Sequence, residues 1–111
     1  MALTTNHLMK KIIMRISGCP LCELFNKKLN THLYYPRTVE DIKNVDFIII
    51  QSIEKKLPIV IYSEHIRTLN KDQFGKILYK CKTLFGKCMI KRDMKQYPNH
   101  IHFYVVDGRH L

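Results

Sequence analysis

The sequence predicts an α/β protein in which strands and helices alternate along the chain. Short apolar segments rich in β-branched residues recur at residues 11–16, 45–50 and 57–62. Apolar residues follow helical spacing at residues 21–33 and again at residues 71–85. This alternation is typical of α/β architecture. The 111 residues suffice for one domain with a single core.

The chain is strongly basic. Nineteen Lys and Arg against nine Asp and Glu give a formal net charge of +10. The positive electrostatic field of such a charge attracts nucleic acid, so the charge is consistent with a nucleic-acid-binding protein. It is equally consistent with an ordinary solvated surface that has no particular partner. We expect no membrane span, because no segment reaches the ~18 consecutive apolar residues that a spanning helix needs. The frequent Lys, Ile and Asn fit an AT-rich genome such as that of a large DNA virus.

The cysteine content favours a reducing compartment. The chain has four cysteines, and residues 1–11 show no apolar core of a secretory signal. Under these conditions a closely spaced pair indicates redox chemistry or metal binding more often than a structural disulfide. We therefore expect a cytoplasmic protein, in the host cytoplasm or the virion if the source is viral.

A C-P-L-C motif at residues 19–22 follows the first predicted strand. Gly18 lets the backbone turn, and the proline of the motif suits the first turn of a helix. We expect this helix to run to about residue 32, where residues 34–37 end it. Cys19 then lies beside unpaired N–H groups at the helix start, which stabilise a thiolate. The motif predicts a reactive dithiol.

The middle of the chain predicts a short helical turn and a hairpin. Residues 38–43 favour one turn capped by Thr38. Residues 45–50 are apolar on both faces, as a central strand requires. Residues 57–62 form a strand with proline near its start, and a polar turn joins them to a second apolar run at residues 66–69.

The longest helix is predicted at residues 71–85. Asn70 is a suitable N-cap and Gly86 a suitable C-cap. Cys81 lies on the apolar face of this helix, so we expect it to be a buried core residue. Cys88 follows the cap, where we expect it to be exposed and open to an intermolecular disulfide.

This order of elements resembles the thioredoxin-like superfamily and, through C-P-x-C, its glutaredoxin branch. The resemblance implies an α/β, thioredoxin-like fold with an about four-stranded mixed sheet flanked by helices, formed by a core of residues 1–86. It also implies that Pro58 is cis and lies beside Cys19, with the backbone of Leu57 offered to an extended substrate. Residues 87–111 form a basic C-terminal extension packed on the same domain. Within it, residues 98–107 predict an added edge strand, a dimer contact or a cover for the core.

The resemblance implies a small thiol–disulfide oxidoreductase. Cys19 is the expected nucleophile and Cys22 the resolving thiol. Arg15 and Asp72 are the expected substrate-binding residues, since they correspond most nearly to the basic and acidic residues of the family's glutathione site. The Thr and the glycines of that site are missing from this chain. We therefore expect no cofactor, with glutathione as the alternative, and a protein disulfide or a thiol reductant as the partner.

A second hypothesis is a redox-inactive binding protein that is nucleic-acid-binding or homodimeric and whose cysteines are structural or bind zinc. A zinc site combining the two motif cysteines with Cys88 and His102 would require the tail to fold back over the motif. His100 and His102 share one face of the predicted strand, and we expect them to face solvent. The sequence therefore predicts no metal site.

Overall fold

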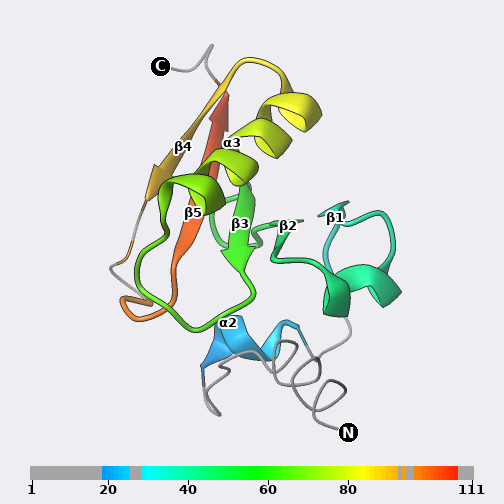
Figure 1. Ribbon diagram of the computed structural model, residues 1–111. Coiled ribbons are helices and arrows are strands. Elements are labelled where there is room, and N and C mark those ends of the chain that lie inside the picture. Colours follow the sequence, from blue (N-terminus) through cyan, green and yellow to red (C-terminus); the bar gives the residue numbers. More distant parts are fainter. Residues whose placement is uncertain (1–18, 26–28, 93, 95–96, 108–111) are drawn as a thin grey trace, which may run out of the picture.

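The computed structural model describes residues 19–25, 29–92, 94 and 97–107 (Figure 1). The predicted α/β class is confirmed, because helices and a single sheet make up the described part of the chain. In chain order the elements are α2 (Pro20–Glu23), β1 (Leu33–Tyr35), the 3-10 helix η1 (Val39–Asn44), β2 (Phe47–Gln51), β3 (Pro58–Tyr62), α3 (Lys71–Phe85), β4 (Cys88–Arg92) and β5 (His102–Asp107).

The sheet has five strands in the order β1-β2-β3-β5-β4, and every neighbouring pair is antiparallel. It therefore differs from the about four-stranded mixed sheet predicted above. The strand predicted at residues 11–16 lies outside the described residues. β1 is an edge strand that the sequence did not predict. Its Leu33 and Tyr35 pair with Ile50 and Ile49 of β2. The aromatic residues that were expected to end a helix thus begin the sheet.

The helix predicted from the C-P-L-C motif to about residue 32 is described as α2, a single turn over Pro20–Glu23. Residues 26–28 lie outside the described part. Thr38 is at the N-cap position of η1, as predicted, but its side chain accepts no capping hydrogen bond. Its hydroxyl instead donates to the Asp41 carboxylate at 2.9 Å. Ile42 is the buried residue of η1 and packs on the motif side of the sheet.

Two apolar cores lie on opposite faces of the sheet, because alternate side chains of β2 and β3 point to opposite sides. The helix-side core lies under α3 and comprises Phe47, Ile49, Val60, Tyr62, Ile77, Cys81, Ile101, Phe103 and Val105. The motif-side core lies toward α2 and comprises Leu21, Phe25, Ile42, Ile48, Ile50, Ile59, Ile61 and Tyr104. Burial on both faces explains why β2 and β3 are continuous apolar runs.

The predicted hairpin between residues 57–62 and 66–69 is wrong. β3 pairs instead with β2 and with β5, which comes from the C-terminal extension. β5 carries buried Phe103, Tyr104 and Val105 and so lies inside the sheet. The edge strand on this side of the sheet is β4, where Lys91 and Arg92 are exposed. Charged side chains of this kind are tolerated at an edge and would be costly in the interior.

Helix α3 has the predicted bounds and the predicted caps. The Asn70 side chain accepts a hydrogen bond from the Gln73 backbone N–H at 2.8 Å. The Gln73 side chain accepts one from the Asn70 N–H at 2.8 Å, which completes a capping box. Gly86 ends the helix with a φ of 71°, a left-handed value that favours glycine. Within the described residues, no helix is long and apolar enough to cross a membrane.

Replacing Asn70 with Ala should lower the free energy of unfolding by about 1 kcal/mol, because the Gln73 backbone N–H loses its side-chain acceptor. Urea denaturation followed by far-ultraviolet circular dichroism would measure this loss. Lys71→Ala is the matched control, since Lys71 is an exposed neighbour outside the capping box. Equal effects of the two substitutions would contradict the capping role.

Candidate metal centre

The two cysteines of the C-P-L-C motif lie on one short turn. Cys19 is the N-cap of α2, and its carbonyl accepts a hydrogen bond from the Glu23 N–H at 3.1 Å. Cys22 follows three residues later, so its side chain lies on the same side of the turn. Leu21 is buried in the motif-side core and fixes the turn against the sheet. Cys22 is 2% exposed, whereas Cys19 is half-buried.

Two histidines come from loops at one end of the sheet. His65 follows β3 and His100 precedes β5. The Ile101 N–H donates to the Ile66 carbonyl at 2.6 Å, and the Tyr62 N–H donates to the Ile101 carbonyl at 3.4 Å. These bonds hold the loops side by side. The two imidazole rings are 5.3 Å apart between centroids and nearly perpendicular, at 89°.

The four side chains of Cys19, Cys22, His65 and His100 converge, and their ligand atoms all lie within 4.8 Å of one another. The Cys22 Sγ lies 3.2 Å from the His65 Nδ1 and 3.3 Å from the His100 Nδ1. The Cys19 Sγ lies 3.6 Å from the His100 Nδ1. A tetrahedral zinc ion with Zn–S of about 2.3 Å and Zn–N of about 2.0 Å separates its S and N ligands by about 3.5 Å. The cluster has the dimensions of a Cys₂His₂ site.

A second hydrogen bond sets the orientation of His100. Its Nε2 donates to the Tyr62 carbonyl at 2.7 Å, and the side chain is fully buried. A carbonyl oxygen only accepts, so in the neutral ring the proton resides on Nε2 and the Nδ1 lone pair faces the two sulfurs. Metal-bound histidines are commonly oriented by such a backbone carbonyl.

His102 supports the backbone of His100. Its Nδ1 donates to the His100 carbonyl at 2.8 Å, and its side chain is 1% exposed. The prediction that His100 and His102 face solvent is therefore wrong. Both are buried because the segment that carries them lies inside the sheet, between β3 and β4, and not along its edge.

The cluster opens to solvent through a shallow pocket of about 150 Å³. Cys19 lines this pocket, whereas Cys22 lies behind it in the protein interior. A metal ion or a small thiol reagent can therefore reach the cluster from this side. The pocket is lined by Cys19, His65, Tyr97, Pro98, Asn99 and His100.

The other predicted site residues lie elsewhere. Leu57 and Pro58 are at the start of β3, whereas the cluster is at its end, about 13 Å away along the strand. The bond before Pro58 is trans, since among the described residues the cis peptide bond is Tyr35–Pro36. Asp72 lines a separate pocket on α3. Arg15 lies outside the described residues.

The prediction of no metal site does not fit this geometry. The cysteines predicted as a redox pair come together with His100 and with His65, a residue that the sequence did not predict as part of a site. Cys88 and His102, the partners considered for zinc, are not part of the cluster. The His ligands lie 43 and 78 residues from Cys22, so no local spacing indicates them.

Comparisons of the chain with protein-family models, curated proteins and solved structures found no match. The chemistry of the cluster is therefore inferred from its residues alone. Two soft thiolate ligands and two imidazoles are a donor set that suits zinc.

Cys81 should be chemically inert, as the predicted core position implies. Its side chain is 0% exposed, and burial, with a smaller effect of Cys88, raises the pKa of the thiol to about 12. At pH 8 only about one molecule in ten thousand then carries the thiolate. Iodoacetamide should label Cys81 only after denaturation, as measured by mass spectrometry. Native labelling of Cys81 as fast as that of half-buried Cys88 would contradict this assignment.

Proposed function

We propose that this protein is a metal-stabilised binding protein that holds one Zn²⁺ through Cys19, Cys22, His65 and His100. The convergence of four ligand atoms within 4.8 Å is the observation that carries the proposal. Four protein ligands leave no open coordination position, which is typical of structural rather than catalytic zinc. The metal would fix the C-P-L-C turn to the end of the sheet.

A metal explains how so short a turn keeps its position. Helix α2 has four residues, and isolated helices of this length do not persist in water. Burial of Leu21 and Phe25 contributes part of the docking energy. The metal would add bonds from this turn to two loops that are remote in sequence. Binding and the ordering of the turn would then be coupled.

Zinc titration of the reduced protein should give one equivalent of tightly bound metal. At a free zinc concentration a thousand times the dissociation constant, the folded state gains about 4 kcal/mol. Chelation should therefore lower the melting temperature. Cobalt substitution should give the visible spectrum of tetrahedral thiolate coordination.

Cys22→Ser and His100→Gln should each lose the metal, whereas Cys88→Ser is the matched control and should retain it. Cys19 is half-buried, so Cys19→Ser tests the same ligand set with less disturbance of the core. A wild-type protein that retains no zinc and melts at the same temperature with and without chelator would refute the site.

A thioredoxin-like thiol–disulfide oxidoreductase is the second candidate function. It is favoured by the unequal exposure of the two sulfurs, because Cys19 lines the open pocket and Cys22 is buried behind it. The Cys19 thiolate would attack a protein disulfide, forming a mixed disulfide and releasing one substrate thiolate. Cys22 would then attack Cys19, releasing the second thiolate and leaving a Cys19–Cys22 disulfide. The substrate gains the two electrons that the dithiol loses.

The two functions differ in whether they require the histidine side chains. Disulfide exchange needs Cys19 and Cys22, whereas zinc binding also needs His65. For the oxidoreductase, Cys19→Ser abolishes reduction of a disulfide-bonded peptide and Cys22→Ser accumulates a mixed disulfide. His65→Gln would then leave turnover within about twofold, since exchange is thiol chemistry. Loss of zinc in His65→Gln, together with no turnover in the wild type, would leave only the metal function.

Both candidates require free thiols, so we propose a reducing compartment such as the cytoplasm. The net charge of +10 leaves nucleic acid as a candidate partner for a binding protein. A protein disulfide or a thiol reductant is the partner for the redox function, and a homodimer fits either.

A further inference from the structure

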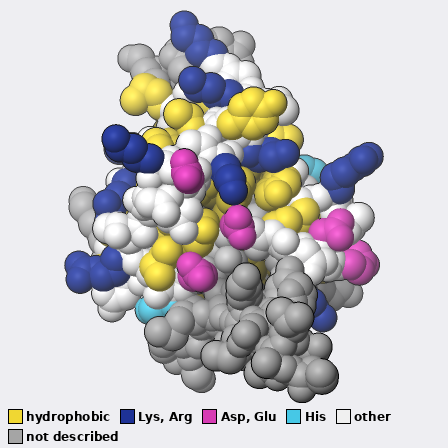
Figure 2. Space-filling model, viewed as in Figure 1, with side chains coloured by type: hydrophobic (Ala, Val, Ile, Leu, Met, Phe, Trp, Pro, Cys, Tyr) yellow, Lys and Arg dark blue, Asp and Glu magenta, His cyan; other side chains and the backbone are white. Residues whose placement is uncertain are grey.

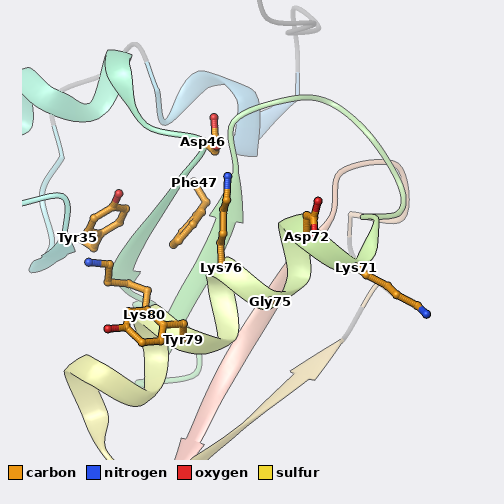
Figure 3. Close-up of a pocket in the computed structure, with 9 residues that line it drawn as sticks. All are labelled: Tyr35, Asp46, Phe47, Lys71, Asp72, Gly75, Lys76, Tyr79 and Lys80. Atoms are coloured by element: carbon orange, nitrogen blue, oxygen red, sulfur yellow. The ribbon is translucent and has the colours of Figure 1, made fainter.

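A second pocket of about 520 Å³ lies between α3 and the sheet and shares no residue with the metal cluster (Figure 3). Its volume falls in the range of about 300–1,000 Å³ that is typical of small-molecule sites. The lining residues combine aromatic rings, lysines and carboxylates, a mixture that neither core contains. They are Tyr35, Asp46, Phe47, Lys71, Asp72, Gly75, Lys76, Tyr79 and Lys80.

Aromatic rings form one wall of this pocket. Tyr35 and Phe47 pack against each other at 5.1 Å between centroids, inclined by 34°. The Lys80 ammonium lies 4.6 Å from the centre of the Tyr35 ring. Tyr79 is 73% exposed at the rim. Burial, and then the charge of Asp46, raise the pKa of Tyr35, so its hydroxyl stays protonated and can donate a hydrogen bond.

Charges of both signs line the rest of the pocket. In Figure 3, Lys76 extends from α3 toward the side of the pocket that carries Asp46, while Lys71 points away. Lys76, Asp46 and Asp72 all line the pocket, so a ligand bound there lies beside charged groups of both signs. Figure 2 shows the same mixture on this face, where basic, acidic and apolar side chains alternate.

A ligand that matches this lining needs a flat ring, an anionic group and hydrogen-bond donors. An inorganic anion would leave the carboxylates without a role and would be repelled by them. A simple cation would be repelled by the lysines. A nucleotide has all three features, since its base stacks on aromatic rings, its phosphate binds lysine and the amino group of its base donates to a carboxylate.

We infer that this pocket binds a nucleotide, either free or as one unit of a single strand. The base lies beside Tyr35, whose ring is backed by buried Phe47, and its exocyclic amino group donates to the Asp46 or Asp72 carboxylate. Lys76 and Lys80 hold the phosphate. Tyr79, at the rim, is placed to stack the next base when the nucleotide belongs to a strand. The net charge of +10 increases the encounter rate with either form.

Gly75 offers a way to close the pocket without disturbing the fold. It lies inside α3, and a Cβ built on it meets no heavy atom within 4 Å. Glycine is also the least favourable residue for a helix interior after proline. Gly75→Leu should therefore fill the pocket while keeping or raising the melting temperature.

Calorimetric titration of the zinc-supplemented full chain with AMP and with a ten-residue oligodeoxyadenylate tests this inference. Lys76→Gln, Lys80→Gln and Gly75→Leu should each weaken binding about tenfold. Lys82→Gln is the matched control, because it removes the same charge from the same helix outside the pocket, and should change affinity less than about twofold. Tyr79→Ala should weaken the strand and not AMP.

AMP and the oligodeoxyadenylate distinguish a site for a free nucleotide from a site for a nucleic-acid strand. Binding of AMP supports a free nucleotide, and binding of the strand alone supports a single-stranded nucleic acid. Absence of binding by both at millimolar concentration would overturn the inference, as would equal losses in Lys82→Gln and Lys76→Gln. Inorganic phosphate that competes as well as AMP would exclude recognition of the base. Chelator should not affect any of these results, so failure of the metal site would leave them unchanged.

Discussion

The position of β5 beside β3 is the constraint on which the rest of the structure depends. β3 is buried on both faces, so both of its edges must be covered by strands that are themselves apolar. β2 covers one edge and β5 the other. Docking β5 draws the preceding loop against the end of β3, where His100 donates to the Tyr62 carbonyl. A requirement of core packing thereby places an imidazole beside the two sulfurs of the C-P-L-C motif.

The two faces of the sheet then acquire different chemistry. Near α2, two cysteine thiols and two imidazoles lie together and are mostly buried. The face under α3 carries an open pocket lined by charges of both signs. The sheet between them is continuous, and both cores pack on β2 and β3. The metal cluster and the pocket share no residue and are separated by this packed layer. A substitution in one can therefore be made without removing a side chain of the other.

What the sequence could predict was local. Asn70, the apolar spacing of α3 and Gly86 are close in sequence, and each acts within one or two turns, so the helix was predicted with its bounds. The apolar runs of β2 and β3 were equally clear. The pairing of β5 with β3, the edge strand β1 and the convergence of His65 with the cysteines depend on contacts between distant segments. Periodicity contains no information about those contacts, and the resemblance to a thioredoxin-like order implies Pro58 as the neighbour of Cys19 instead.

The exposed edge of the sheet bears on self-association. β4 leaves one row of backbone N–H and C=O groups unpaired by the described strands, which is a surface that a second copy could extend. Lys91 and Arg92 lie on this strand, and Lys87 immediately precedes it. Pairing of two such edges would gather three cations from each copy along one narrow ribbon. Their mutual repulsion opposes that pairing and weakens as salt screens it, so ionic strength controls how readily two copies can dimerise through this edge.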